Sequence, residues 1–330
     1  MQNTETQPVS GTFASASAIA VSPQRPTQHV LPRTSSSLPA GTRKVGILAG
    51  WGRYPVVIAE ALREQGYEVF VLGVKGHADP ALADISHHFG WVGLAKIGGA
   101  VRFFRQHGVN HVTMAGKIHK FLLFQSWAWI KHLPDWRAIR TFYPHFATTK
   151  KDRRDDTLLN AVVDTFAEDG ITFAPATDFL PELLVKLGKL TKRGPTKQEA
   201  TDIEFGWTMA KELGRLDIGQ SVTIKGRAAL AVEAIEGTDA CIRRAGQLCA
   251  PGFTVVKVAK PKQDMRFDVP TIGLGTLESM VEAGASCLAV EAGRTIIIDQ
   301  PEVIRYADRH RVAIVAVNDG QVPETAEGQK

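Results

Sequence analysis

Apolar positions along this chain fall into short continuous runs and longer stretches with helical spacing, and the two kinds alternate from residue 44 onward. In the first half, the strand-like runs lie at residues 44–50, 67–74 and 109–115, and the helical patterns at 56–65, 94–106 and 158–167. Continuous apolar runs are typical of strands buried on both faces, whereas helices repeat their apolar positions every three or four residues. Their alternation predicts a parallel sheet covered by helices, with ligands at the carboxyl ends of the strands.

The second half predicts a mixed sheet. Gly226 and Arg227 join two strand-like runs, 221–225 and 228–234, as a hairpin, so these strands are expected to be antiparallel. Further strand-like runs lie at 253–259, 287–290, 295–298 and 312–316, and helical patterns at 196–213, 273–283 and 301–309. A polar, turn-rich stretch at 189–195 separates the halves. We therefore predict a two-domain α/β protein, with an N-terminal Rossmann-like parallel-sheet unit and a C-terminal mixed α/β domain.

The predicted division is a leader at 1–42, the N-terminal domain at 43–192, the C-terminal domain at 193–318 and a polar tail at 319–330. The leader is rich in Ser, Thr, Pro, Gln and Ala and has no sustained apolar period, which favours disorder. It lacks the cationic start and apolar stretch of a secretory signal, and no later segment reaches the roughly 20 apolar residues of a membrane span. We expect a soluble, cytoplasmic protein that could still touch a membrane surface.

Charge and cysteine content narrow the functional classes only slightly. A formal net charge of +5 permits an acidic ligand such as a nucleotide or phospholipid, but it is too small to require nucleic acid. The basic residues also form no continuous stripe with a known module. Cys241, Cys249 and Cys287 are odd in number and lack C-x-x-C spacing, which argues against a disulfide framework. Neither they nor the scattered histidines predict a zinc site.

The stretch 231–244 combines hard anionic ligands with cations. The acids are Glu233, Glu236 and Asp239, and the cations are Arg243 and Arg244. A break at Gly237 followed by Thr238 as the helix N-cap would place Asp239 in the first helical turn. Two interpretations stay open: a capped helix with solvated charges, or a site where carboxylates bind a metal and arginines bind phosphate.

Two further clusters follow predicted strands and could bind phosphate. Lys260 and Lys262 come directly after the run 253–259, where the site of an α/β domain would lie. Gly50 and Gly52 follow the first strand and could cradle a phosphate at a helix N-terminus. The turn lacks the third glycine of the dinucleotide fingerprint, and no ribose-binding acid follows the second strand. A nucleotide contact and a merely tight turn both stay open.

The middle of the chain carries two more candidates. Asp155 and Asp156 precede a helical pattern, where they could cap the helix or hold a hydrated divalent cation against a diphosphate. The segment 121–146 interleaves aromatic residues with cations. Such a segment could cover a lipid chain, lie at a membrane interface, stack bases or form core between domains. An amphiphilic ligand fits this mixture best.

Together these motifs resemble the LpxI-type UDP-2,3-diacylglucosamine pyrophosphatases of lipid A biosynthesis. In the second half the resemblance rests on Gly214-Arg-Leu-Asp-Ile-Gly-Gln220, Leu230-Ala-Val-Glu-Ala-Ile-Glu-Gly-Thr-Asp-Ala240 with Arg243-Arg244, Lys260-Pro-Lys262, Asp268-Val-Pro-Thr-Ile-Gly273 and Glu291-Ala-Gly-Arg294. In the first half it rests on the looser Gly46-Ile-Leu-Ala-Gly50 and Asp155-Asp-Thr-Leu-Leu159. The resemblance extends over roughly residues 43–318. The chain departs from the family in its long leader and its tryptophan-rich 121–146 segment.

The resemblance implies two domains that hold a lipid-linked nucleotide sugar between them. It also implies hydrolysis of the diphosphate, dependent on Mg²⁺ or Mn²⁺, to UMP and 2,3-diacylglucosamine 1-phosphate (lipid X). The essential aspartate of the family corresponds to Asp239, which would bind the metal or orient the attacking water. Glu233 and Glu236 are weaker candidates for the same metal shell. Arg243, Arg244, Lys260 and Lys262 would clamp phosphate, Gly50 and Gly52 would contact the substrate, and Asp155 and Asp156 would complete the metal site.

Contact with the inner membrane surface and assembly into a homo-oligomer stay open at this point. Two other functional classes also stay open. One is a nicotinamide-dependent or nucleotide-sugar oxidoreductase that uses the first domain for its dinucleotide. The other is a sensor that binds a nucleotide or lipid without catalysis.

Overall fold

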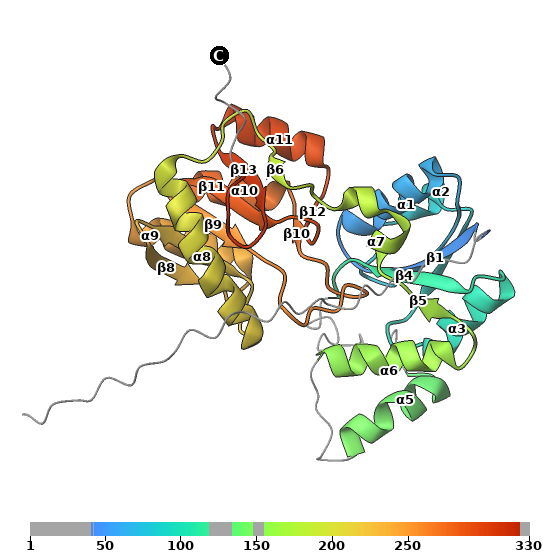
Figure 1. Ribbon diagram of the computed structural model, residues 1–330. Coiled ribbons are helices and arrows are strands. Elements are labelled where there is room, and N and C mark those ends of the chain that lie inside the picture. The colour runs from blue at the N-terminus through green and yellow to red at the C-terminus, as the bar shows by residue number, and fades with distance from the viewer. Residues whose placement is uncertain (1–40, 42, 119–133, 148–154, 324–330) are drawn as a thin grey trace, which may run out of the picture. The chain divides into compact units, whose positions relative to one another are not determined.

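A computed structural model of the chain describes residues 41, 43–118, 134–147 and 155–323. Five parallel strands form its first sheet, in the order β3-β2-β1-β4-β5 (Figure 1). The strands are β1 (Lys44–Ala49), β2 (Glu68–Val74), β3 (His88–Val92), β4 (His111–Ala115) and β5 (Thr172–Phe173). The order reverses its direction between β1 and β4, the point at which open α/β sheets bind their ligands. The predicted parallel sheet is confirmed.

Strand β3 is an addition to the predicted pattern. Its five residues include His88 and Gly90, and Trp91 is 44% exposed, so the stretch lacks a continuous apolar run. It joins the sheet because its backbone pairs with β2 from Phe70 to Val74. Edge strands need only one buried face, and this explains why the apolar pattern did not mark it.

Helices cover both faces of the first sheet. They are α1 (Tyr54–Glu64), α2 (Leu82–Ile85), α3 (Ile97–Gln106), α5 (Trp136–Ala147), α6 (Asp155–Ala167) and α7 (Ala176–Phe179), followed by the 3-10 turn η2 (Pro181–Leu183). Ile47 and Val71 point to one face and pack with α1, α2 and α7, whereas Phe70 and Leu72 point to the other and pack with α3, α5 and α6. Successive strand residues alternate between faces, so a strand covered on both faces is apolar throughout.

Six strands form the second sheet, in the order β6-β13-β11-β9-β7-β8. They are β6 (Gly188–Lys189), β7 (Ser221–Lys225), β8 (Ala228–Val232), β9 (Phe253–Lys257), β11 (Ala285–Glu291) and β13 (Ala313–Val317). The central strands β9, β11 and β13 are parallel, while β6, β7 and β8 are antiparallel to their neighbours, so the sheet is mixed as predicted. Strand β6, which the predicted division places in the first domain, pairs here with β13.

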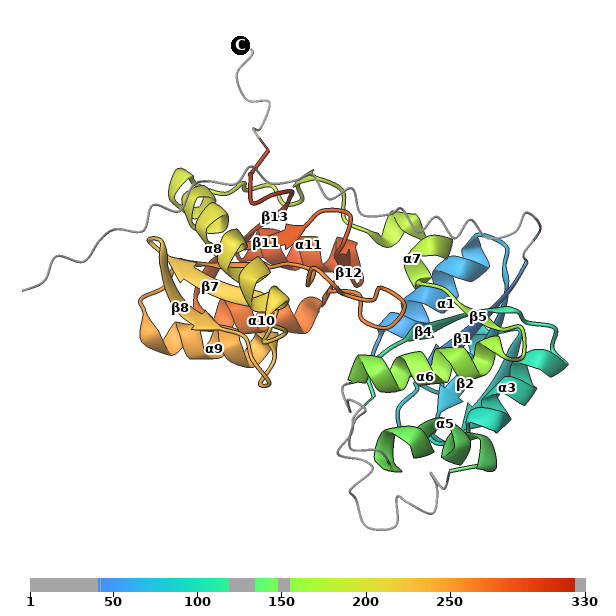
Figure 2. The same cartoon turned by 60° about the horizontal axis from the view of Figure 1, so that its bottom comes forward.

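Four helices cover the second sheet (Figure 2). They are α8 (Lys197–Arg215), α9 (Thr238–Leu248), α10 (Leu274–Ala283) and α11 (Gln300–Arg309), and a separate two-stranded ribbon joins β10 (Thr271–Ile272) to β12 (Ile296–Ile297). Helix α8 packs on one face of the sheet, and α9, α10 and α11 pack on the other. Across the residues described, no helix combines the length and apolarity needed to cross a membrane.

The predicted hairpin between β7 and β8 is confirmed. Gly226 and Arg227 both adopt positive φ, 59° and 60°, which matches the right-handed twist of a two-residue hairpin turn. The buried carboxylate of Asp202, on α8, accepts hydrogen bonds from the amides of Gly226 (3.1 Å) and Arg227 (2.7 Å). This side chain compensates for the strain of a non-glycine residue at positive φ. The hairpin thus fixes the register of β8 against β7, and with it the starting point of the loop that follows β8.

Candidate functional site

The loop that follows β8 carries the acidic motif into the first turn of α9. The expected placement of Asp239 in that turn is confirmed. The expected N-cap is wrong: Gly237, at φ 82°, occupies the cap, and Thr238 is the first helical residue. A cap at positive φ favours glycine because it has no Cβ. The one-residue shift turns the Thr238 hydroxyl away from the helix amides, and it donates a hydrogen bond to Glu233 Oε1 at 3.0 Å.

A buried lysine lies behind this loop. Lys257 is the last residue of β9, is 6% exposed, and stands opposite Ser221 of β7 in the sheet. Its Nζ donates to the Thr238 hydroxyl at 3.2 Å and to the Thr271 carbonyl at 3.0 Å. The Ser221 and Thr238 hydroxyls are 3.3 Å apart. Because Thr238 has one hydroxyl proton and gives it to Glu233, Ser221 is the donor in this pair.

Glu233 supplies the charge that balances this lysine. It is 8% exposed, and its Oε2 atom is buried with no hydrogen-bond partner among the described residues. Burial lowers the pKa of Lys257, and the nearby Glu233 carboxylate opposes that shift. The Thr238 hydroxyl links the two groups, because it donates to Glu233 and accepts from Lys257, and removal of Glu233 would take away the strongest of the negative charges that favour the buried ammonium. Glu233 is thus enclosed, in contrast to the metal-ligand role that the sequence suggested for it.

Asp239 lies in the first turn of α9, directly after the same loop. It is half-buried, and its Oδ1 accepts a hydrogen bond from Thr276, in the first turn of α10, at 2.9 Å. A partly exposed carboxylate is the kind of ligand that a hard cation such as Mg²⁺ or Mn²⁺ takes, one or two at a time, together with substrate oxygens and water. In the part of the chain that is described, no three His, Cys, Asp or Glu side chains converge as a metal site.

The arginines of α9 extend in two directions. Arg243 donates to the Ser279 hydroxyl on α10 at 2.8 Å. Arg244 donates to the Val232 carbonyl at 2.9 Å and forms an ion pair with Glu236 at 2.5 Å. The Glu236 backbone amide and Arg244 lower the pKa of the Glu236 carboxyl. Both guanidinium groups lie at the surface beside the motif, and Glu236 is ionised but engaged with Arg244.

The loop after β9 is held in place by a second buried acid. Glu291 accepts hydrogen bonds through Oε2 from the Ala259 amide (2.7 Å) and from Lys211 Nζ (2.6 Å), and Lys211 also donates to the Ala259 carbonyl at 3.1 Å. Beyond this clamp, Lys260 forms an ion pair with Asp217 at 2.7 Å, and Lys262 is exposed. The two predicted phosphate-binding lysines thus lie on an exposed turn, and Lys257, which the sequence-based reasoning missed, lies inside.

Two family models match this chain. That of the LpxI N-terminal domain matches residues 44–183, and that of the LpxI C-terminal domain matches residues 186–315. The UDP-2,3-diacylglucosamine pyrophosphatase LpxI of Caulobacter vibrioides is 31% identical over 294 residues, which cover 85% of this chain and 100% of that protein. The chain belongs to the LpxI family. The resemblance drawn from its motifs is confirmed.

The glycine turn after β1 in the LpxI N-terminal domain has a packing reason of its own. The Gly50 amide donates to the Ala115 carbonyl, and Trp51 and Lys117 exchange two backbone hydrogen bonds, of 2.8 and 2.9 Å. A Cβ at Gly50 would lie 2.7 Å from the Lys117 carbonyl oxygen, so this close approach requires glycine. Gly52 adopts φ 107° with open space around it. A substrate contact at Gly50 and Gly52 stays a prediction.

The remaining candidates lie partly outside the described residues. The backbone of Asp155 and Asp156 begins α6, but their side chains are outside the described part of the structure, as is the segment 119–133. Three aromatic side chains of α5 in the 121–146 segment are described: Trp136 is 79% exposed, Tyr143 is 68% exposed, and Phe142 packs against the core of the first sheet. The proposed roles of the two aspartates and of the aromatic segment stay predictions.

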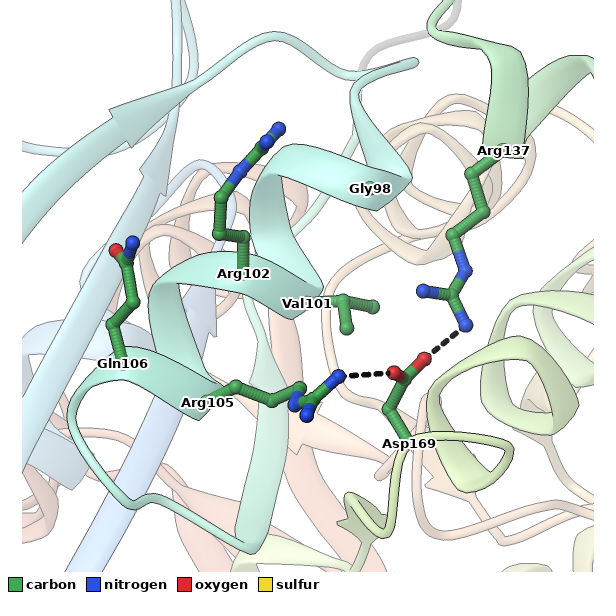
Figure 3. Close-up of a pocket in the computed structure, with 7 residues that line it drawn as sticks. All are labelled: Gly98, Val101, Arg102, Arg105, Gln106, Arg137 and Asp169. Carbon is green, nitrogen blue, oxygen red and sulfur yellow. Dashed lines mark hydrogen bonds and ion pairs between the residues drawn. The ribbon is translucent and has the colours of Figure 1, made fainter.

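A pocket of about 520 Å³ lies between α3 and α5 of the LpxI N-terminal domain (Figure 3). Its charged wall consists of Arg102, Arg105, Arg137 and Asp169. Asp169 accepts from Arg105 at 2.9 Å and also forms an ion pair with Arg137, so a single carboxylate joins two of the three arginines. Sequence-based reasoning did not identify this cluster, because its members come from three separate elements. Because Asp169 pairs with Arg105 of α3 and Arg137 of α5, the cluster has a structural role: it links α3 and α5 to the end of α6.

Proposed function

We propose that this chain hydrolyses the diphosphate of UDP-2,3-diacylglucosamine and releases UMP and 2,3-diacylglucosamine 1-phosphate, with a divalent cation, Mg²⁺ or Mn²⁺. The observation that supports this most is the placement of Asp239 in the first turn of α9, bonded to Thr276, in a chain of which 85% matches the whole of a UDP-2,3-diacylglucosamine pyrophosphatase. Under this proposal, a water oxygen attacks one phosphorus, the bond from that phosphorus to the bridging oxygen breaks, and the bridging oxygen leaves on the other phosphate.

The residues of the chain have distinct tasks in this reaction. When bound, Mg²⁺ or Mn²⁺ would neutralise charge that develops on the diphosphate oxygens. Asp239 binds the cation or orients the attacking water. Arg243 and Arg244 reach non-bridging oxygens as planar, bidentate donors, and Lys260 and Lys262 act as point charges. Glu236, which pairs with Arg244, together with Asp155 and Asp156, would be further carboxylate ligands of the cation.

The test is to follow UMP release from UDP-2,3-diacylglucosamine by the purified full chain with Mg²⁺, with Mn²⁺ and with chelator. Turnover is expected with at least one cation, and none with chelator. Failure with both cations would overturn the proposal.

The variant that tests the role of Asp239 in this reaction is Asp239→Ala. Loss of a group that stabilises charge in the transition state lowers kcat by about a hundredfold or more. Glu212→Ala, which removes an exposed acid on α8 that pairs with Arg215, serves as the control and is expected to keep full turnover. Undiminished turnover by Asp239→Ala would leave Asp239 with only a structural role as an acid in the first turn of α9.

The acyl chains of the proposed substrate also bring the enzyme to a lipid surface. We propose cytoplasmic, peripheral contact with the inner membrane through the exposed aromatic residues of α5, Trp136 and Tyr143. Flotation with anionic vesicles is expected to carry the full chain upward, and the variant Trp136→Ala less so. Equal flotation of both would remove α5 from the proposed contact.

A further inference from the structure

Lys257 is a buried cation whose ammonium contacts the start of the motif. It is 6% exposed, and its two hydrogen bonds go to protein atoms, the Thr238 hydroxyl and the Thr271 carbonyl. A buried ammonium costs free energy unless its surroundings use it. Its effect on the reaction must therefore pass through the groups that it contacts, Thr238 and Thr271.

The conformation of the loop between Glu233 and Thr238 is fixed by contacts at its two ends. Ile235 is fully exposed, and Gly237 has positive φ with no atom near the place of a Cβ. The inner residues of the loop therefore gain little from packing. The ends are fixed instead: Thr238 binds Glu233 and Lys257, and the Glu233 backbone pairs with Ser221 through its amide at 2.9 Å. Since Asp239 follows Thr238 directly, its direction is set by this anchor.

The second contact of Lys257 reaches Asp239 from the opposite side. The Thr271 carbonyl lies in β10, a short strand that leads through Gly273 into α10. The first turn of α10 carries Thr276, whose hydroxyl holds Asp239 Oδ1 at 2.9 Å. A single ammonium group thus ties together the two segments that fix Asp239, one through the backbone and one through a hydrogen bond.

We infer that Lys257, with its charge partner Glu233 and the Thr238 hydroxyl, is a positioning unit that sets the orientation of Asp239 for the reaction. This inference rests on the proposed function for its kinetic consequence, but its structural consequence can be measured without substrate. Outer partners of reactive or metal-binding groups commonly change activity by about 10- to 100-fold when they are removed.

The first experiment compares Thr238→Val, which keeps the shape and removes the hydroxyl, with Thr238→Ser, which keeps the hydroxyl. Thr238→Val is expected to lower kcat about 10- to 100-fold with KM within about threefold of wild type, and Thr238→Ser to restore most of the loss. Thr223→Val is the matched control. It removes a buried hydroxyl from β7, one that bonds the backbone of Ala231 at 2.9 and 3.1 Å, and should lower the melting temperature without changing kcat.

The second experiment tests the charge pair. Lys257→Met alone leaves Glu233 buried without its counter-charge, and this variant is expected to lose stability. The double variant Lys257→Met with Glu233→Gln removes both charges, so it should recover much of the melting temperature while kcat stays low. Recovery of kcat together with stability would overturn the positioning role and leave a purely structural one.

Hydrogen exchange of the substrate-free protein separates this inference from the proposed function. Thr238→Val and the double variant should speed amide exchange in residues 234–240 about tenfold, whereas Thr223→Val should not. Unchanged exchange in these variants would overturn the inference, whichever substrate the protein turns over. Absence of UMP release by the wild-type chain would instead overturn the proposed function and leave the exchange result intact.

Discussion

Lys257 and Lys260 stand three residues apart at the end of one strand, yet their environments are opposite. Lys257 is buried against Thr238 and Thr271, whereas Lys260 has turned outward to pair with Asp217 on the surface. The amide between them, that of Ala259, is fixed by the buried carboxylate of Glu291. The last residue of β9 therefore supports the site from within, and the turn beyond it offers cations to solvent.

Gly219 limits the space behind Glu233. A Cβ built on it would lie 2.1 Å from the Glu233 carbonyl oxygen, far inside contact distance. We predict that Gly219→Ala forces the two backbones apart, lowers the free energy of unfolding by about 1–3 kcal/mol and lowers kcat by displacing the motif. Thermal denaturation and UMP release measure both effects. Gly99→Ala, whose Cβ would meet its nearest neighbour, Lys96, at 3.7 Å, is the control. A Gly219→Ala variant with wild-type stability and turnover would contradict the prediction.

At the scale of elements, α8 supports the second sheet through its first two turns. Thr196 and Glu199 form a capping box at its start, and Arg193 and Ser286 also bind the Glu199 carboxylate, at 2.5 and 2.6 Å. Asp202, one turn later, holds the β7–β8 hairpin. Because β8 leads directly into the motif, the helix and the site are mechanically connected through the hairpin.

The capping box predicts how stability depends on pH. Burial alone would raise the pKa of Glu199, but hydrogen bonds from Arg193, Ser286 and the Thr196 amide outweigh it and lower the pKa overall. A carboxyl with a depressed pKa in the folded state stabilises the protein above its unfolded pKa, about 4.3, and this contribution is lost as the pH falls through the folded pKa. Urea denaturation from pH 7 to pH 3 should show a steeper acid loss for wild type than for Glu199→Gln.

The control is Glu204→Gln, which changes an exposed acid on the same helix. It should keep the wild-type pH profile, while Glu199→Gln should be less stable than wild type at pH 7 by roughly 1–3 kcal/mol. Parallel pH profiles for wild type and Glu199→Gln would show that the box does not contribute to acid unfolding.

The hairpin gives a separate prediction. Asp202→Ala removes the acceptor of two turn amides, one of them on Arg227 at positive φ. Hydrogen bonds to a buried charged group contribute about 1.5–3 kcal/mol each, so the free energy of unfolding should fall by at least roughly 2 kcal/mol. Amide exchange of β8 should also accelerate relative to that of β11. A stable variant with unchanged exchange in β8 would show that the turn holds its shape without the carboxylate.

At the scale of the whole molecule, the described residues form a five-stranded parallel sheet and a six-stranded mixed sheet, each covered by helices on both faces, and the ribbon of β10 and β12. Both LpxI domain models match the chain, one on each large sheet. The candidate carboxylate, Asp239, lies on α9 beside the second sheet, and under the proposed function substrate oxygens would supply part of the cation's ligands.

Metal removal should therefore affect turnover and stability differently. Dialysis against chelator is expected to abolish UMP release, and added Mg²⁺ or Mn²⁺ to restore it. The melting temperature of the substrate-free chain should change by less than about 1 °C, because a cation that needs substrate oxygens binds the free protein too weakly to stabilise it. A large chelator-induced drop in melting temperature would point to a cation held by the protein alone.

The sequence predicted the main alternation of strands and helices, the hairpin at Gly226 and the place of Asp239 in a first helical turn, but not the short elements α2, α7, β6 and β10 or the helix α5. Each of these features depends on residues close together in the chain. The spacing of apolar residues marks the strands and helices, Gly226 marks the hairpin turn, and Gly237 marks the start of the helix that carries Asp239. The sequence did not predict the edge strand β3, because β3 lacks a continuous apolar run and is held in the sheet by its backbone pairing with β2.

Only the tertiary structure decided which cation supports Asp239. Strand β9 is buried on both faces, so its apolar pattern does not say to which face Lys257 points. The hydrogen bonds that give the lysine its role join it to Thr238 and Thr271, residues 19 and 14 positions away in the chain. Sequence spacing favoured Lys260 and Lys262 because they follow the strand. In the folded protein, the end of β9 lies beside the start of α9 and beside β10, so Lys257 is the lysine that contacts both.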